Sequence, residues 1–460
     1  MRYFKSALLF AGMLFFSITQ AQEYQVHSFA FLDQWSEVVH KNLTFEAGHL
    51  QAIRNDLDGL FRSNAISIPF VARDPFIALS LEWQVKPEST LPIELQIRNS
   101  SDGQEWNAWQ TIQVDPHAPE SPGRFFGQMQ LIDADFAFIQ FQMKILPHSS
   151  VQVQQLKFHY YYPGENDAPP VGTAPASPEA CTCMTPNIIE RTDWCPAGNC
   201  PTIVNPTITE VTHLIVHHSA TSNTSTDWAA VVRSIWNTHV NSWGWSDIGY
   251  NWLVDPTGQL YRGRGQGIQG AHFCGTNAGT TGVCMLGNFQ LTPPSNAAQQ
   301  TLQAFLAWQS CLEDIDPLGN SFHNSSNLNL AHISGHRDGC STECPGNTFY
   351  PLFNGIRQGV QNYIDLNCNS TSTHTTPQNE NINLAIFPNP NSGTFQLQSQ
   401  SEQSLVLFLN NAQGQIIWRG QLAPNEHREI QMPQLSAGLY WLNSQTTDGR
   451  RQRQEKLIIQ

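Results

Sequence analysis

Residues 335–346 read GHRDGCSTECPG, and residues 214–220, well upstream, read LIVHHSA. Together the two stretches supply the imidazoles of His217 and His336 and the thiol of Cys344. Catalytic zinc sites typically have three protein ligands and keep a fourth position open for water or substrate. Two imidazoles and one thiolate therefore predict a catalytic zinc site, and the rest of the chain is interpreted around it.

The local sequence around each ligand fits this prediction. His217 follows an apolar run with strand character and is expected at a strand end. His336 and Cys344 lie in a stretch with glycines and a proline, which favours a loop that folds back on itself. Strand alternation points His218 to the opposite face from His217, where packing is its expected role.

Two alternatives to a catalytic site remain open. The first is a histidine in ordinary contacts and a cysteine in a disulfide, because secreted proteins use cysteine mainly for bridges. The second is a structural zinc site, although such sites are usually closed by four ligands.

Several short motifs occur in a fixed order between residues 187 and 366. They are RTDW at 191–194, VHHSA at 216–220, DIGYNW at 247–252, YRGRG at 261–265, GAH at 270–272, GHRD at 335–338 and TECP at 342–345. In these motifs the chain resembles the peptidoglycan recognition protein family, which overlaps the zinc N-acetylmuramoyl-L-alanine amidases of the phage-lysozyme type. The resemblance implies a mixed sheet flanked by helices, with a surface groove.

The same resemblance implies an activity and its residues. Zinc held by His217, His336 and Cys344 would serve hydrolysis of the amide between N-acetylmuramic acid and the L-alanine of peptidoglycan stem peptides. Tyr250 matches the family's catalytic tyrosine, whose hydroxyl can donate to a developing oxyanion. Thr342 matches a position that holds threonine in catalytic members and lysine in the phage enzymes, so no cation assists the oxyanion there.

Other residues are weaker candidates for the site. His272 resembles a groove residue of the family and is expected to touch substrate. Arg262 and Arg264 either pair with stem-peptide carboxylates or are ordinary surface charges. Glu343 and Asp338 are the nearest carboxylates for a general base, although carboxylates in such loops are usually solvated.

The resemblance leaves a second function open. Some relatives bind peptidoglycan without cleaving it, on the same fold. Cys344 and Tyr250 favour the enzyme, because binding-only relatives commonly lack the zinc cysteine.

Composition limits the class of protein. A chain of 460 residues predicts about three domains. The net charge of −14 argues against a nucleic-acid partner, which favours a basic face. Residues 1–21 have a basic start, an apolar run and small residues at the end, and are expected to be a secretory signal peptide. No other segment is expected to span a membrane, and the mature protein is expected to leave the cytoplasm.

Residues 22–163 are predicted to form an all-β sandwich that resembles carbohydrate-binding modules and helps to hold the polymer. Apolar and polar residues alternate at 93–98 and 136–143. Trp106 and Trp109 either stack on sugar rings or, as we expect, fill the sandwich core. Residues 164–179 are rich in proline and alanine and are expected to be a linker.

Residues 180–367 are predicted to form a mixed α/β amidase domain. The expected strands are 211–217, 250–254, 259–262 and 283–286, and the middle two form a hairpin about residues 255–258. Helices are expected to begin at Ser225 or Thr226, at Ser295 and near Leu352.

The chain has ten cysteines, which fits an oxidising compartment. With Cys344 reserved for zinc, nine remain, so at least one is expected to lack a partner within the chain. Cys274 and Cys284 flank a glycine-rich loop and are the expected bridge.

Residues 386–460 are predicted to form a small C-terminal β-sandwich after a linker at 368–385. They contain FPNPNSGTF at 387–395, NAQGQ at 411–415, LSAGLY at 435–440 and KLII at 456–459. In these motifs the region resembles the type A sorting domain of the type IX secretion system. The implied partner is that secretion machinery, and the implied location is the cell surface or the exterior. The alternative is an ordinary β-rich adhesive module.

Overall fold

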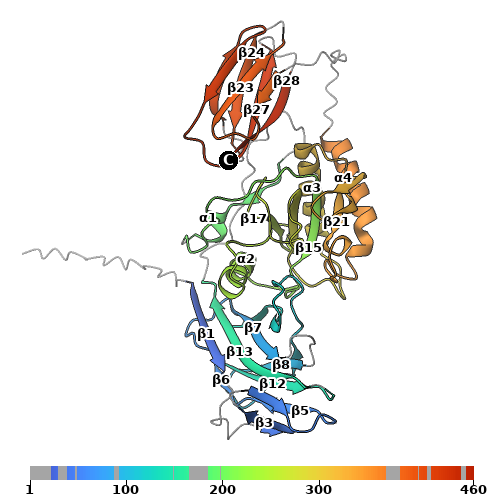
Figure 1. Cartoon of the computed structure of the whole chain (residues 1–460). Coiled ribbons are helices and arrows are strands. Elements are labelled where there is room, and N and C mark those ends of the chain that lie inside the picture. The colour runs from blue at the N-terminus through green and yellow to red at the C-terminus, as the bar shows by residue number, and fades with distance from the viewer. Residues whose placement is uncertain are drawn as a thin grey trace, which may run out of the picture.

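The computed structural model describes residues 22–29, 39–46, 49–86, 93–148, 150–164, 185–196, 198–368, 384–401, 404–411, 416–446 and 452–460. The N-terminal, central and C-terminal regions follow one another along one axis (Figure 1). The expected signal peptide and nearly all of the two expected linkers lie outside the described residues. Within the described ranges, no helix combines the length and apolar character needed to cross a membrane.

The N-terminal region consists of two antiparallel sheets. The first has the order β10-β7-β13-β4-β3, with β1 beside β13 and β11 beside β7, and the second has the order β2-β5-β12-β8-β9, with β6 beside β12. Their bounds are β1 Glu23–Phe29, β2 Val39–Lys41, β3 Leu43–Glu46, β4 His49–Ala52, β5 Gly59–Arg62, β6 Ile66–Ser67, β7 Phe76–Lys86, β8 Ile93–Ser100, β9 Gln110–Thr111, β10 Arg124–Phe126, β11 Gln130–Asp133, β12 Phe138–Ile145 and β13 Gln152–Tyr162.

One apolar core lies between these two sheets. Leu81 and Phe158 from the first sheet pack in it together with Ile97 and Phe141 from the second. The predicted alternation is confirmed in β8 and β12, where every second side chain is buried. The N-terminal region is therefore a sandwich, as predicted.

Trp106 and Trp109 lie outside this core. Both are half-buried, and the guanidinium of Arg98 lies 5.0 Å from the ring centre of Trp106 and 4.4 Å from that of Trp109. Arg98 is on the outward face of β8, so the arginine holds both rings against the outside of the sandwich. The expectation that the two tryptophans fill the core is wrong.

The central region contains a six-stranded mixed sheet with the order β14-β17-β16-β18-β15-β21. β16 and β17 form the expected antiparallel hairpin, and the other neighbours are parallel. The bounds are β14 Ile188–Ile189, β15 His213–His218, β16 Trp252–Val254, β17 Leu260–Arg262, β18 Thr280–Met285 and β21 Ile333–Gly335, with a separate hairpin of β19 Asn320–His323 and β20 Leu328–Ala331.

Helices cover both faces of this sheet (Figure 1). On one face, Leu302 of α3 (Asn296–Glu313) and Val360 of α4 (Phe353–Asn367) pack on Val216 and Val283. On the other face, Ile235 of α2 (Trp228–Asn237) packs with residues of β16 and β18. The short elements are α1 Arg191–Trp194, a π-helical turn Thr238–Ser242, and 3-10 turns at His336–Asp338 and Tyr350–Leu352.

Two helix starts compare differently with the prediction. The Ser295 hydroxyl accepts a hydrogen bond from the Ala298 N–H at 3.1 Å, so the expected cap is confirmed. α2 is capped instead by Asp227, whose carboxylate accepts from the Ala230 N–H at 2.8 Å. Ser225 contributes indirectly, because its hydroxyl accepts the N–H of Asp227.

The N-terminal sandwich is fastened to the central region through a second apolar core. Phe76 and Ala78 of β7 and Tyr161 of β13 pack in it against Trp194 and Ile235. Neighbouring residues of β7 point to the sandwich core, so this strand is buried on both faces. A contact this apolar favours one fixed arrangement of the two regions.

Arg233 of α2 adds a polar fastening at the same junction. The side chain is buried, and its guanidinium donates to the carbonyl oxygens of Pro163 at 2.7 Å, Gly164 at 3.1 Å and Trp194 at 2.7 Å. The guanidinium thus bonds to carbonyl oxygens on both sides of the junction. These hydrogen bonds restrict sliding of one region on the other.

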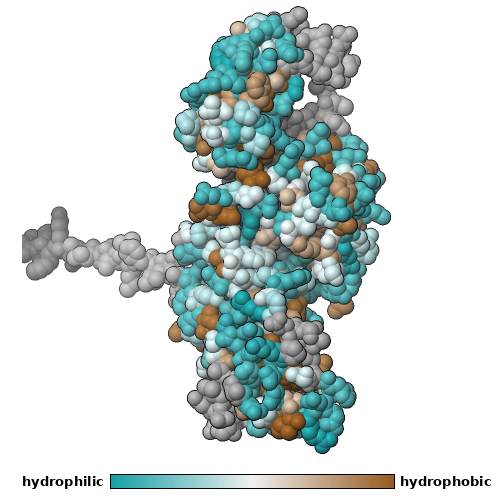
Figure 2. Space-filling model, viewed as in Figure 1, coloured by the Kyte–Doolittle hydropathy of each residue, from teal (hydrophilic) through white to brown (hydrophobic). Residues whose placement is uncertain are grey.

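The C-terminal region is a smaller β-sandwich with sheets β22-β23-β26 and β25-β24-β27-β28 around one core. It touches the central region through Leu439 and Trp441, and through an ion pair between Lys456 and Glu313. Figure 2 shows a mostly hydrophilic surface on the viewed face, with small, separate apolar patches. The strands are β22 Leu384–Phe387, β23 Thr394–Ser399, β24 Leu405–Asn410, β25 Ile416–Leu422, β26 His427–Gln431, β27 Gly438–Thr446 and β28 Gln452–Ile459.

The expected Cys274–Cys284 bridge is wrong. Cys274 is bonded to Cys340. Cys284, near the carboxyl end of β18, points into the core beside α2 and does not pair with Cys274 in the exposed loop. Within the described residues the free cysteines are Cys284 and Cys344, which agrees with the expectation of an unpaired cysteine besides Cys344.

Four other described cysteines are also disulfide-bonded. Cys195 pairs with Cys200, and Cys311 and Cys368 are also disulfide-bonded. The disulfides fit the oxidising compartment that the cysteine count predicts.

Candidate metal centre

His217 lies at the carboxyl end of β15, a strand buried along its whole length. β15 runs between β18 and β21, both parallel to it, so three strand ends meet at one edge. Val216 packs beneath α3 and α4, so alternation turns His217 to the opposite face. His218 points back toward the helices, where its Nδ1 accepts the Phe289 N–H at 3.3 Å.

His336 follows β21 directly and opens a single 3-10 turn. The Gly335 N–H donates to the Asp338 carboxylate at 2.8 Å, and the Tyr350 hydroxyl donates to the other oxygen of the same carboxylate. These contacts hold the turn beside the end of β15. They also occupy both oxygens of Asp338, one of the two carboxylates considered as a general base.

The loop after this turn folds back and returns Cys344 to His217. The backbone N–H of Arg337 and its side-chain Nε both donate to the Cys344 carbonyl, at 3.1 and 3.2 Å. Cys344 is fully buried, with its Sγ 3.8 Å from Nδ1 of His217. The Cys344 N–H donates to the Thr342 hydroxyl at 3.1 Å, which gives Thr342 a role in the shape of this loop.

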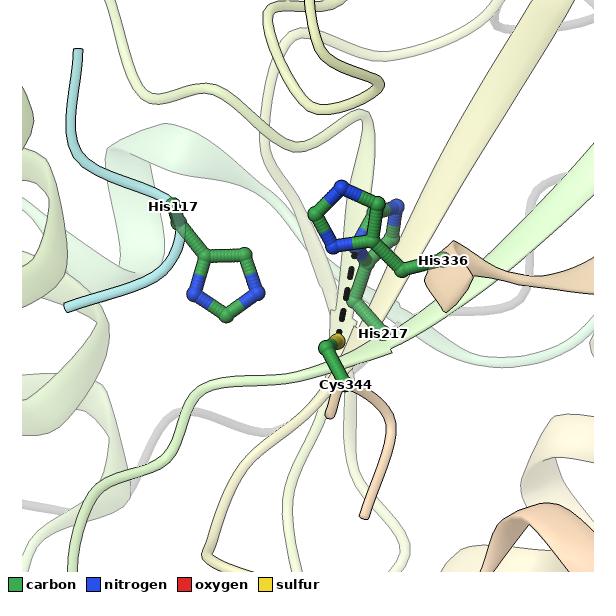
Figure 3. A group of neighbouring side chains, drawn as sticks. All are labelled: His117, His217, His336 and Cys344. Atoms are coloured by element: carbon green, nitrogen blue, oxygen red, sulfur yellow. Dashed lines mark hydrogen bonds between the residues drawn. The ribbon is translucent and has the colours of Figure 1, made fainter. Parts of the chain in front are cut away.

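A fourth residue joins the three that the sequence predicts. His117, from the loop between β9 and β10 of the N-terminal sandwich, offers a ring nitrogen to the same cluster, and the four ligand atoms all lie within 4.8 Å of one another. Figure 3 shows the four side chains gathered around one point, with His117 coming from a separate segment. His117 is not among the predicted site residues, because nothing in the local sequence links it to the central motifs.

Asp115 sets the orientation of His117. Its carboxylate lies 3.1 Å from Nδ1 of His117 and also accepts the His117 N–H at 2.9 Å. A carboxylate on one ring nitrogen fixes the tautomer and leaves the other nitrogen as an acceptor. The His117 side chain is only 6% exposed, and its Nε2 is buried with no hydrogen-bond partner.

The cluster suits a zinc ion. Nδ1 of His336, like Nε2 of His117, is buried without a hydrogen-bond partner, so neither nitrogen is committed to another contact within the protein. Imidazole nitrogens and a thiolate are the donors that zinc prefers. Nε2 of His217 lies 3.0 Å from Nδ1 of His272, a contact that orients the His217 ring and leaves Nδ1 for a ligand bond.

The electrostatics agree with neutral imidazoles at His217 and His336. Burial lowers the pKa of both His217 and His336 well below its ordinary value, and neighbouring imidazoles lower it further. For His117, burial also favours a lower pKa, but the negative charges of Cys344 and Asp115 outweigh it and raise the pKa to about 10. The raised pKa of His117 shows that this point favours positive charge, which a bound metal ion would supply in place of the proton.

Tyr250 and His272 line the cavity beside the cluster. This cavity, of about 470 Å³, is also lined by His117, His336 and Trp245. The Tyr250 ring centre lies 5.4 Å from that of His217. Burial, reinforced by nearby Cys284 and Cys344, raises the pKa of Tyr250 well above its ordinary value, so the hydroxyl keeps its proton.

The two arginines considered for substrate binding have internal partners. Arg262 forms an ion pair with Glu190 at 2.6 Å, and its guanidinium lies 4.9 Å from the ring centre of Trp252. Arg264 donates to the carbonyls of Ile248 and Gln269 at 2.7 and 2.9 Å. Neither belongs to the residues that line the 470 Å³ cavity, so contact with substrate remains a prediction for both.

Two segments of the chain match known protein families. Residues 207–347 match the family model described as N-acetylmuramoyl-L-alanine amidase, and residues 385–460 match that of the secretion system C-terminal sorting domain. Peptidoglycan-recognition protein SC2 of Drosophila melanogaster is 31% identical over 172 residues, which are 37% of this chain and 84% of the relative. This chain belongs to the peptidoglycan recognition protein family.

Other known proteins are similar to parts of this chain. The N-acetylmuramoyl-L-alanine amidase of Homo sapiens is 34% identical over 143 residues, which are 30% of this chain and 23% of that protein. Among solved structures, a complex of peptidoglycan recognition proteins LCa and LCx with tracheal cytotoxin is similar at 26% identity and a TM-score of 0.32, over 36% of this chain and 94% of that one.

The amidase family match covers three of the four residues of the cluster. His217, His336 and Cys344 lie inside residues 207–347, whereas His117 lies in a region that the amidase family model does not match. The recognition-protein part of the chain therefore brings three donors, and the fourth comes from the N-terminal sandwich.

Proposed function

We propose that this protein is a zinc-dependent N-acetylmuramoyl-L-alanine amidase that hydrolyses the amide between N-acetylmuramic acid and L-alanine of peptidoglycan stem peptides. The observation that carries the proposal is the convergence of two buried imidazoles and a buried free thiol at the end of the central sheet. His217, His336 and Cys344 would hold the ion. When bound, zinc supplies a Lewis acid that polarises a carbonyl and acidifies water.

The chain's own residues would perform the remaining tasks. His272 orients the His217 ring through the 3.0 Å contact at Nε2. The His218 N–H lies 3.3 Å from Sγ of Cys344, a contact that supports negative charge on the sulfur. Tyr250 remains protonated and lines the cavity, so it can donate a hydrogen bond to the carbonyl oxygen as negative charge develops.

We also propose the organisation and destination of the chain. Residues 1–21 are a signal peptide, 22–163 an accessory domain that retains the polymer, 180–367 the amidase domain, and 386–460 a sorting domain. The type IX secretion machinery would carry the protein to the cell surface or exterior. The match of residues 385–460 to the sorting-domain family supports this route.

Mass spectrometry of purified muropeptides tests the reaction. Incubation with the zinc-loaded full chain should release intact stem peptides that begin at L-alanine. The His117→Ala variant, which removes the donor that comes from outside the amidase match, is tested beside it. Unchanged muropeptides with both proteins, together with measurable binding, would favour a non-catalytic peptidoglycan-binding protein on the same fold.

A further inference from the structure

We propose that His117 is a fourth protein ligand of the metal, and that the N-terminal sandwich thereby keeps the amidase in a closed, latent state. The proposal rests on the proposed function, because it requires the metal centre of the central region. It goes beyond that function, because it assigns a regulatory role to a region outside the amidase match.

The geometry of His117 is that of a ligand held in place. Its Nε2 is buried and lacks a hydrogen-bond partner, and one of its ring nitrogens lies within 4.8 Å of the ligand atoms of His217, His336 and Cys344. Its ring stacks on that of His336, with the centres 5.2 Å apart. The opposite nitrogen contacts Asp115, the carboxylate–histidine arrangement that is usual for metal-bound imidazole.

The number of ligands decides the state of the site. Zinc with four protein ligands is coordinatively closed, whereas a catalytic zinc keeps one position for water or substrate. Three imidazoles and one thiolate would fill all four positions. In this arrangement the centre has the ligand count of a structural site, although three of its ligands match those of an amidase.

The loop that carries His117 is secured at its base. The Asp115 N–H donates to the Phe126 carbonyl at 2.8 Å, and Arg124 at the far end donates to the buried Glu82 carboxylate at 2.9 Å. Pro116, Pro119 and Pro122 lie within this loop, and each fixes one backbone angle. The apolar junction between the sandwich and the central region then places the loop over the metal site.

Opening therefore means withdrawal of the loop tip, residues 116–120, while the two regions stay packed together. These tip residues form one wall of the cavity that also contains Tyr250 and His336. A stem peptide bound in this cavity would lie against the same loop tip that carries His117. We infer that the substrate competes with His117 for the fourth position.

Cobalt substitution of the full chain tests the coordination directly, since the visible absorption of Co(II) reports its ligand number. The comparison uses wild type, His117→Ala and, as a matched control, His40→Ala, which removes an exposed histidine of the same sandwich. His117→Ala should shift the cobalt spectrum toward a site with a solvent ligand and accelerate zinc loss to a chelator. His40→Ala should match wild type in both.

The amidase rate on soluble muropeptides gives the second readout. If at least nine-tenths of the molecules are closed, opening the site raises the rate at least about tenfold. His117→Ala should show this rise. An unchanged cobalt spectrum would overturn His117 as a ligand, and a changed spectrum without a faster rate would overturn the latent state.

A second variant covers the case in which His117→Ala folds poorly. Asp115→Asn keeps the His117 ring but weakens its orienting contact, and should speed zinc release by about 10–100-fold, the range for loss of such a partner. Equal zinc release in Asp115→Asn and wild type would count against the proposal. If wild type and all variants bind neither cobalt nor zinc, the metal assignment of the proposed function fails as well.

Discussion

The central metal centre and the N-terminal loop reach the same point in space by different routes. His217, His336 and Cys344 come from two short motifs that one sheet brings together. His117 comes from a loop of another fold, held there by a junction between regions. The spacing of sequence motifs can therefore predict metal donors that lie within one fold. A donor that comes from a neighbouring region leaves no such local pattern in the sequence.

The two sources should also respond to mutation in opposite directions. Loss of a central ligand removes the chemistry, whereas loss of His117 removes a restraint.

Cys344→Ser should abolish metal binding and reduce hydrolysis to background, in the wild-type chain and in His117→Ala alike. Serine exchanges the thiolate for a hydroxyl that stays protonated, so the metal loses its only anionic ligand. Metal content is measured by atomic emission and hydrolysis by muropeptide mass spectrometry. Cys284→Ser is the matched control, since Cys284 is equally buried and free and should leave metal content unchanged.

Full metal occupancy in Cys344→Ser would show that Cys344 is not a metal ligand but an ordinary buried thiol. Peptidoglycan binding should survive this substitution, because other residues build the cavity. A variant that binds peptidoglycan but holds no metal would show that polymer binding does not depend on the metal centre.

Tyr250→Phe should lower kcat by about 10²–10³-fold, the usual effect of losing one oxyanion donor. Metal content should stay at the wild-type level, because the Tyr250 hydroxyl is not a ligand. Kinetics on a soluble muropeptide in the His117→Ala background give the clearest measurement. A loss confined to KM would show that Tyr250 contributes only to binding.

The smallest effect concerns the anchor of the N-terminal loop. Burial alone would raise the pKa of Glu82, but hydrogen bonds from His159, Arg124 and Lys157 outweigh it and lower the pKa to about 2. A lowered pKa in the folded state means that Glu82 stabilises fully above pH 4.5 and loses this contribution as pH falls toward 2. The contribution is about 3 kcal/mol at neutral pH.

Thermal unfolding of wild type and Glu82→Gln between pH 7 and pH 2 measures the contribution of Glu82 to the free energy of unfolding. Wild type should lose stability across that window, and Glu82→Gln should be less stable at pH 7 but flatter with pH. Parallel pH profiles for the two proteins would remove Glu82 from the account of how the loop is secured.

Much of the central region follows from local sequence. The hairpin about residues 255–258, the Ser295 cap and the side of β15 on which His217 lies depend on turn chemistry and strand alternation, which act over a few residues. The fold-back of residues 335–346 is equally local, because Arg337 reaches the Cys344 carbonyl within the same loop.

Other features depend on contacts that sequence does not display. Cys274 and Cys284 are close along the chain, but β18 turns Cys284 into the core, and Cys340 is the partner in space. Trp106 and Trp109 have the composition of a core, but Arg98 holds them on the outside. The position of His117 beside the cluster depends on the packing of two separate folds against each other. No pattern of residue types in the sequence indicates this packing.

X-ray absorption at the zinc edge of the full-length protein tests the central claim most directly. The account predicts one sulfur at about 2.3 Å and imidazole nitrogens at about 2.0–2.1 Å, with three histidines in wild type and two in His117→Ala. A zinc shell without sulfur, in either protein, would contradict it.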